Sequence, residues 1–322
     1  MKILERESGL RAKYMLEDIY RSDEWERSQE RRLQPQQTSS ATSTSSENQV
    51  LFIQQVSEAA SPNGRNYKRS EVWDNSKGLE SFILGNSVDL LNILHPSPFA
   101  SAPVAMKLRE WLESRVSTTL WIRGTPVSHY PNELSALAGS LVNAATASKT
   151  PILFHFCEPV RSNDMIPGFT AEQCGAVSLA FSLIRQLILL LETDFDTSVD
   201  FGKARFLLLE KPLENWKDVL ALLEALFDLS PGVLLCVIDG IDYLDYGPGQ
   251  PMCTDILDIL KRRKLSSATQ GFVLKTLFTS AGVSMTLDKK LGLDEVVIDE
   301  EPQHRGSGKP GPGQKLIFGE DM

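Results

Sequence analysis

The sequence predicts an α/β fold in which a doubly wound, mainly parallel sheet of five strands is flanked by helices and preceded by a helical N-terminal region. The clearest strand covers residues 233–239, where six apolar residues follow one another and end at Asp239. An uninterrupted apolar run is typical of a strand buried on both faces of a parallel sheet. Other apolar runs alternate with helical patterns, which predicts right-handed crossovers between parallel strands.

Composition and charge limit the class of protein. The chain has 322 residues, of which 42% are hydrophobic, and this is enough for one sizeable domain with appendages. Its net charge is −9 and no stripe of Lys and Arg occurs, so we expect no nucleic-acid partner. No apolar run is long enough to span a membrane, and the charged start is unlike a signal peptide. Four cysteines without CxxC spacing favour a reducing, cytoplasmic location.

Some of the regions outside the sheet are expected to be helical and others to be disordered or flexible. Residues 1–33 form a charged amphipathic helix, either a solvated tail or an arm that binds a protein partner, and residues 34–48 form a disordered Ser/Thr-rich linker. Residues 49–100 are a helical lead-in, with one helix over 81–94. The tail at 300–322 is rich in Gly and Pro and is expected to be flexible.

Residues 101–299 carry the predicted sheet domain. Its strands are expected at 118–124, 151–157, 233–239, 272–280 and 295–298. Its helices are expected at 103–115, 132–147, 170–191, 216–229 and 253–264. The acidic stretch at 193–200 is expected to be a loop between two of these helices.

Two of the strands resemble those of a known family. The apolar run that ends in Asp239-Gly240-Ile241-Asp242 resembles the Walker B strand of NACHT-type STAND nucleotide-triphosphatases. The strand at 118–124, with the preceding Trp-Leu helix, is similar to the opening strand of fungal NACHT and nephrocystin-like domains. The resemblance implies a P-loop NTPase-like sheet that acts as a nucleotide-gated signalling switch.

The phosphate loop implied by this resemblance is degenerate. A working loop needs glycines whose N–H groups hold phosphate, a Lys, and a Ser or Thr for magnesium. Here only Gly124 matches, and His129, Tyr130 and Pro131 stand where the second Gly, the Lys and the Ser/Thr are required. Gly124, Ser128 and His129 remain the candidate nucleotide-binding residues. We expect His129 to be a surface or packing histidine, since it is largely neutral at physiological pH.

The acidic motif is incomplete as well. Asp239 matches the position that holds magnesium in the family, and Asp242 is the candidate catalytic residue, but Tyr243 replaces a common Glu. The alternative role for Asp239 is to cap the following turn. Residues 279–282 read Thr-Ser-Ala-Gly, without the Arg of the family's sensor strand. Asp245 is expected to be a solvated loop residue.

Further motifs give no site. The Gly-Lys pair at 308–309 follows no buried strand and precedes Pro310, so it is not expected to bind phosphate. The four histidines lack metal-ligand spacing, and His155 is expected to be a core or strand-end residue.

Three functional hypotheses follow. The first is a non-catalytic regulatory or interaction module, which needs no cofactor and binds nucleotide weakly or not at all. The second is a magnesium-dependent ATPase or GTPase switch that binds Mg-ATP or Mg-GTP and uses Asp239 and Asp242. The third is a structural protein that self-associates through the sheet domain and recruits protein partners through residues 1–33.

Overall fold

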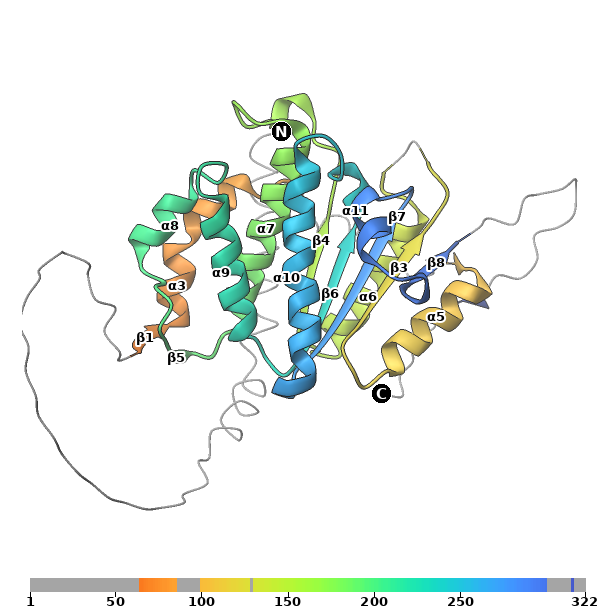
Figure 1. Ribbon diagram of the computed structural model, residues 1–322, viewed down its shortest axis with the longest axis horizontal. Coiled ribbons are helices and arrows are strands. Elements are labelled where there is room, and N and C mark those ends of the chain that lie inside the picture. The colour runs from red at the N-terminus through yellow and green to blue at the C-terminus, as the bar shows by residue number, and fades with distance from the viewer. Residues whose placement is uncertain (1–63, 86–98, 128–129, 300–313, 316–322) are drawn as a thin grey trace, which may run out of the picture.

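A five-stranded parallel sheet forms the centre of the molecule. The computed structural model describes residues 64–85, 99–127, 130–299 and 314–315 (Figure 1). From one edge to the other, the strands are β4 (Ile152–Phe156), β6 (Val233–Asp239), β7 (Val273–Ser280), β3 (Thr118–Arg123) and β8 (Val296–Ile298). Every neighbouring pair is parallel, which confirms the predicted parallel α/β sheet and each of its five strands.

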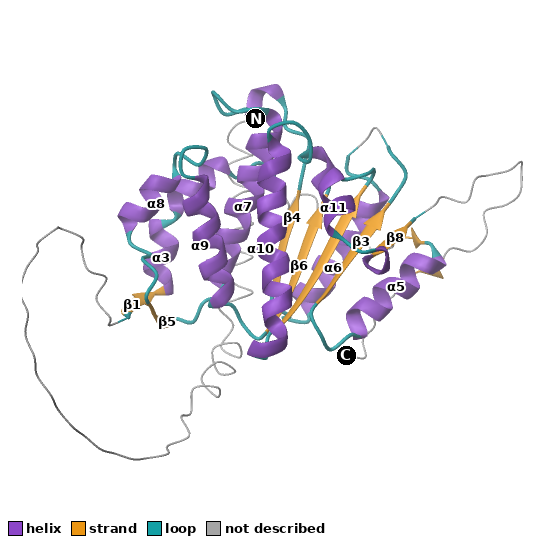
Figure 2. Ribbon diagram, viewed as in Figure 1, coloured by secondary structure: helices purple, strands orange, loops and turns teal. Residues whose placement is uncertain are grey.

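Helices cover the two faces of this sheet (Figure 2). On one face lie α5 (Ala102–Glu113) and α6 (Glu133–Ala147), whose apolar residues pack with Leu120, Ile122 and Val237. The layer on the other face contains α7 (Ala171–Leu189), α9 (Trp216–Asp228) and α10 (Gly249–Gln270). The result is a three-layer arrangement in which the middle strands are buried on both sides, as their continuous apolar sequence predicts.

Local sequence fixes where the two helices nearest the candidate site begin. Asn132 accepts hydrogen bonds from the N–H groups of Leu134 (2.9 Å) and Ser135 (3.1 Å), and thereby caps α6. Thr170 accepts from the N–H of Gln173 at 3.3 Å and caps α7. These side chains satisfy donors that a helix start leaves without partners, so both helices begin within one residue of their predicted positions.

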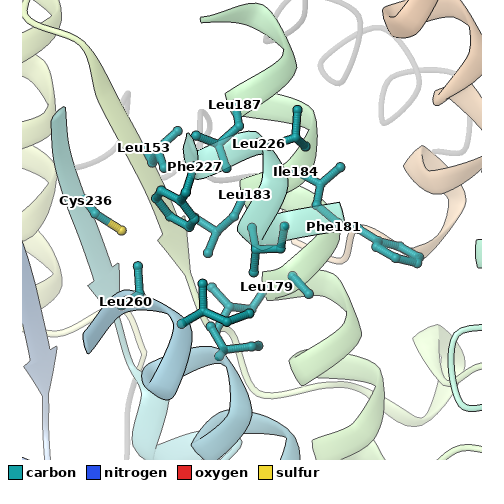
Figure 3. Packing of buried hydrophobic residues seen from close by; sticks show 14 of the residues in the cluster. Leu153, Leu179, Phe181, Leu183, Ile184, Leu187, Leu226, Phe227, Cys236 and Leu260 are labelled. Carbon is teal, nitrogen blue, oxygen red and sulfur yellow. The ribbon is translucent and has the colours of Figure 1, made fainter. Parts of the chain in front are cut away.

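The helix α7 is the hub of the larger core (Figure 3). Its Leu183 and Ile184 are fully buried, and its neighbours include Phe227 of α9 and Leu153 and Cys236 of the sheet. Such all-round burial explains why α7 reads as almost continuously apolar. All four cysteines of the chain are buried free thiols, and three of them, Cys157, Cys236 and Cys253, lie in this core.

A small unit packs on the outer side of α7. It consists of β1 (Arg65–Lys68), α3 (Arg69–Asn75), the 3-10 helix η1 (Lys77–Phe82), β5 (Asp194–Thr197) and α8 (Lys203–Leu209). Arg185 of α7, 4% exposed, fastens this unit by stacking on the Trp73 ring, donating to the Trp73 carbonyl at 2.6 Å and pairing with Glu80.

The strand β5 corrects a prediction. Its residues lie in the acidic stretch 193–200 that was expected to be a loop, yet they pair antiparallel with β1. Phe195 explains the difference, because its ring lies 6.1 Å from that of Tyr67 and 5.7 Å from that of Phe201. The buried aromatic cluster therefore outweighs the low strand propensity of the flanking aspartates.

Several other expectations concern residues outside the described ranges. The predicted helix at 1–33 and linker at 34–48 lie there, as does most of the tail at 300–322. Of the predicted helix at 81–94, the described part is the end of η1 and an extended segment from Ile83. The short β2 (Phe99–Ala100) pairs with β9 (Gln314–Lys315). No described helix is long and apolar enough to cross a membrane.

Candidate functional site

The order of the strands places a topological switch point at the carboxyl ends of β3 and β7. These strands are adjacent, but the chain leaves β3 through α6 on one face and leaves β7 through α11 (Met285–Lys290), which packs against α10 on the other face. In parallel α/β sheets, ligands bind where connections diverge in this way. The predicted site residues that the structure describes all lie at this edge.

Gly124 follows β3 directly and has a structural task. Its N–H donates to the Ser280 carbonyl at 2.8 Å, which extends the β3–β7 ladder by one bond. A Cβ at this position would come within 2.9 Å of Leu134 Cδ1, so glycine allows α6 to pack closely. The other two candidate phosphate ligands, Ser128 and His129, lie outside the described residues.

Asp239 ends β6 and is 1% exposed. Its Oδ1 accepts a hydrogen bond from Thr279 Oγ1 of the neighbouring strand at 2.6 Å. Its Oδ2 has no hydrogen-bond partner among the residues that the structure describes. Burial raises the pKa of this carboxyl group to about 6, because removing a carboxylate from water disfavours its charged form, although the bond from Thr279 opposes the shift.

Asp242 lies close by in the 3-10 helix η3 (Ile241–Tyr243). Its Oδ1 is buried and also lacks a hydrogen-bond partner in the described part of the chain. Burial is the main cause of the rise of its pKa to about 6, and the charges of Asp239 and Asp245 add to it. Two carboxyl groups whose pKa values are raised by burial therefore share this edge of the sheet.

Tyr130 stands at the position where a phosphate loop has its Lys. Its ring meets the ring of Tyr243 edge-on, with 5.6 Å between centroids, and its hydroxyl is buried. Burial raises the pKa of Tyr130, and the charge of Asp239 raises it further, so the phenol is neutral. The hydroxyl lies near the Asp239 carboxylate but makes no hydrogen bond of normal geometry with any described residue. The Tyr130–Tyr243 pair thus forms an aromatic layer beside the buried acid.

The side chain at the end of β7 also has a structural role. Ser280 Oγ accepts from Trp121 Nε1 at 2.8 Å and donates to the Gly282 carbonyl at 2.8 Å. The next residues, Ala281 and Gly282, carry no charge, and Asp242 Oδ2 lies 3.4 Å from where a Gly282 Cβ would stand. The turn that follows this strand therefore carries no arginine, and the carboxylate of Asp242 from η3 lies beside it.

Asp245 is buried, so the expectation of a solvated loop residue is wrong. It is 3% exposed and accepts hydrogen bonds from Ser284 Oγ and from the Thr286 N–H, both at 2.6 Å, and from the Thr286 hydroxyl. These bonds tie the loop after β6 to the start of α11. Ser284, a residue type that favours helix starts, is the one local signal for this contact, and its hydroxyl also accepts from the Leu287 N–H.

His155 lies within β4 and is 2% exposed, which confirms that it is a core histidine. Burial lowers its pKa to about 4, and its Nδ1 has no partner among the described residues. Within the described ranges, no three His, Cys, Asp or Glu side chains are grouped so that they could hold a metal ion.

Comparison with known proteins adds no assignment, since neither a family model nor a curated protein matches the sequence.

Proposed function

We propose that the chain is a non-catalytic interaction module, built on a P-loop NTPase-like sheet of the NACHT/STAND kind, that does not depend on a nucleotide. The observation that carries the proposal is the position of Tyr130, a neutral aromatic side chain packed on Tyr243 beside the buried Asp239. A phosphate-binding loop needs a cation at this position.

Charge supports the same conclusion. Residues 124–131, between β3 and the cap of α6, contain no Lys or Arg. The Gly124 N–H, which a phosphate would need, already donates to Ser280. Asp239 and Asp242 stand at the end of the nearby strand β6 and in η3, so a bound phosphate would meet negative groups without a fixed positive charge to offset them.

A magnesium-dependent ATPase or GTPase is the second candidate. One observation favours it: Asp239 Oδ2 and Asp242 Oδ1 are buried without partners among the described residues, and carboxylate oxygens suit magnesium. Magnesium in such enzymes is also held by the phosphates of the substrate, and the turn after β3 offers no Lys to position them. The residues present therefore fit Mg-ATP or Mg-GTP poorly.

As an interaction module, the chain would bind protein partners through residues 1–33 or associate with itself through the sheet domain. Its four free, buried thiols suit a reducing compartment, and we place the protein in the cytoplasm.

Phosphate release distinguishes the two candidate functions. The full chain is incubated with ATP or GTP and magnesium, and the Asp239→Asn variant serves as the comparison. The proposed function predicts that both proteins release phosphate at the rate of buffer alone. Release that depends on the wild-type protein and is lost in the variant would support the enzyme and contradict the proposal.

A further inference from the structure

A groove lies on the face of the sheet that α7, α9 and α10 cover only in part. In Figure 2 the face of β7 and β3 beside α10 is open to the viewer, below α11. The groove is lined by side chains of α10, β7, β3 and the segment that leads to β8. Its apolar lining consists of Leu257, Leu260, Leu265, Phe278 and Leu291. Leu265 is 67% exposed, so a large apolar side chain stands at the rim.

The rim of this groove is basic. Lys261, Lys264 and Lys290 line it together with one acid, Glu295, in a chain whose net charge is −9. Lys264 pairs with Glu295, and Lys290 pairs with Asp258 at 2.6 Å. Lys261 donates to the Lys290 carbonyl at 3.3 Å and carries the positive charge of the rim that no ion pair among the described residues offsets. An apolar floor with a basic rim suits an acidic segment that carries large apolar side chains.

The chain contains a segment of this chemistry outside the described residues. Residues 17–30 include six acidic and two basic residues, which gives a net charge of −4, and Asp23, Glu24 and Glu26 surround Trp25. Tryptophan is the side chain most often found as the anchor of a protein interface. The preceding residues 1–16 contain four basic and two acidic residues, so the negative charge belongs to the second half of the N-terminal region.

The connection to the domain is long enough for this segment to reach the groove. Residues 31–63 separate it from Gly64, the first described residue, and a random-coil chain of this length would span roughly 30 Å on average. Tethering of this kind gives an effective concentration on the order of millimolar, so even a modest intrinsic affinity would keep the groove occupied. We propose that residues 17–30 dock into the α10 groove of their own chain, with Trp25 against the apolar floor and the surrounding acids facing Lys261 and Lys264.

This docking is independent of the state of the carboxyl edge, so it does not rest on the absence of nucleotide binding. Its consequence is regulatory: an arm that occupies its own groove is withheld from partners until a competitor for the groove releases it.

Zero-length carbodiimide cross-linking of the full chain tests the proposal, because it joins carboxylates to lysines that are in contact. We expect links from Asp23, Glu24 or Glu26 to Lys261 or Lys264. Mixing unlabelled and nitrogen-15-labelled protein identifies the source of each link, and the proposal predicts links within one chain only.

Three variants make the test specific. Trp25→Ala and Leu265→Asp should each lower the yield of these links by about tenfold or more, because one removes the anchor and the other places a negative charge on the rim. Leu208→Asp is the matched control, since Leu208 is 58% exposed on α8 at the other end of the molecule, and its yield should equal that of the wild type. Absence of the links, equal yields in all variants, or links only between labelled and unlabelled chains would overturn the proposal.

Discussion

Replacing Asp239 by Asn should stabilise the protein at neutral and alkaline pH, although the residue stands where the resemblance places a magnesium ligand. Burial raises the pKa of this carboxyl group from its ordinary 3.8 to about 6. Because the folded protein holds this proton more tightly than the unfolded chain, the contribution of Asp239 to stability is most favourable below about pH 4 and falls as the pH rises through 6. A shift of this size corresponds to about 3 kcal/mol that the charged carboxylate costs the folded state above pH 7.

Asparagine removes that cost and keeps an acceptor for the Thr279 hydroxyl, whose bond to a neutral group is weaker by about 1 kcal/mol. The expected net gain of Asp239→Asn is therefore about 2 kcal/mol at pH 8, and it should vanish or reverse near pH 4. Urea unfolding of the full chain at both pH values measures the difference between variant and wild type. Asp164→Asn, at an exposed position in the loop before α7, is the control and should change stability by less than about 0.5 kcal/mol.

The outcome that would refute this reasoning is a variant less stable than the wild type at pH 8, or a difference that does not change with pH. The first result would mean that the folded protein stabilises the charged carboxylate, as a bound cation would do. The second would mean that the carboxyl group has the same pKa in the folded protein and in the unfolded chain.

Two further substitutions test side chains that hold β4 and α11 in place. Gln186→Met should lower the free energy of unfolding by about 2–5 kcal/mol. The Gln186 amide accepts from the Phe154 N–H at 2.9 Å and donates to the Phe154 carbonyl at 2.8 Å on the outer edge of β4. The substitution would leave the N–H and the carbonyl of Phe154 buried without partners. Urea unfolding checks this, with Gln250→Met at a half-buried position as a control that should stay within about 0.5 kcal/mol. Asp245→Asn should lower the free energy of unfolding by about 1–3 kcal/mol and speed amide hydrogen exchange in α11, because an amide replaces the carboxylate that accepts from Thr286. Unchanged exchange in α11 would contradict the role of Asp245 as the anchor of this helix.

The elements of the sheet could be predicted because each depends mainly on its own residues. The strand β6 matches its predicted range, and β7 begins within one residue of it, since an unbroken apolar run can be buried only between two layers. The strand β5 could not be predicted in this way, because its stability comes from Phe195 packing on Tyr67, far away in the sequence.

In the candidate site, too, some features follow from local sequence and others depend on distant residues. The positions of Asp239 and Gly124 at the carboxyl edge follow from where their strands end. The burial of Asp245 depends on Thr286, 41 residues further along, and the packing of Tyr130 depends on Tyr243, so neither could be read from local sequence. What a single sequence omits is which distant residues meet, and this determines whether a carboxylate is solvated or buried.

The central claim is that the carboxyl edge of this sheet does not hold a nucleotide, and equilibrium binding of Mg-ATP and Mg-GTP to the full chain tests it most directly. Calorimetric titration with and without magnesium should show no saturable binding up to about 1 mM, a limit that corresponds to about 4 kcal/mol of binding free energy. Saturable, magnesium-dependent binding that is lost on Asp239→Asn substitution would contradict the claim.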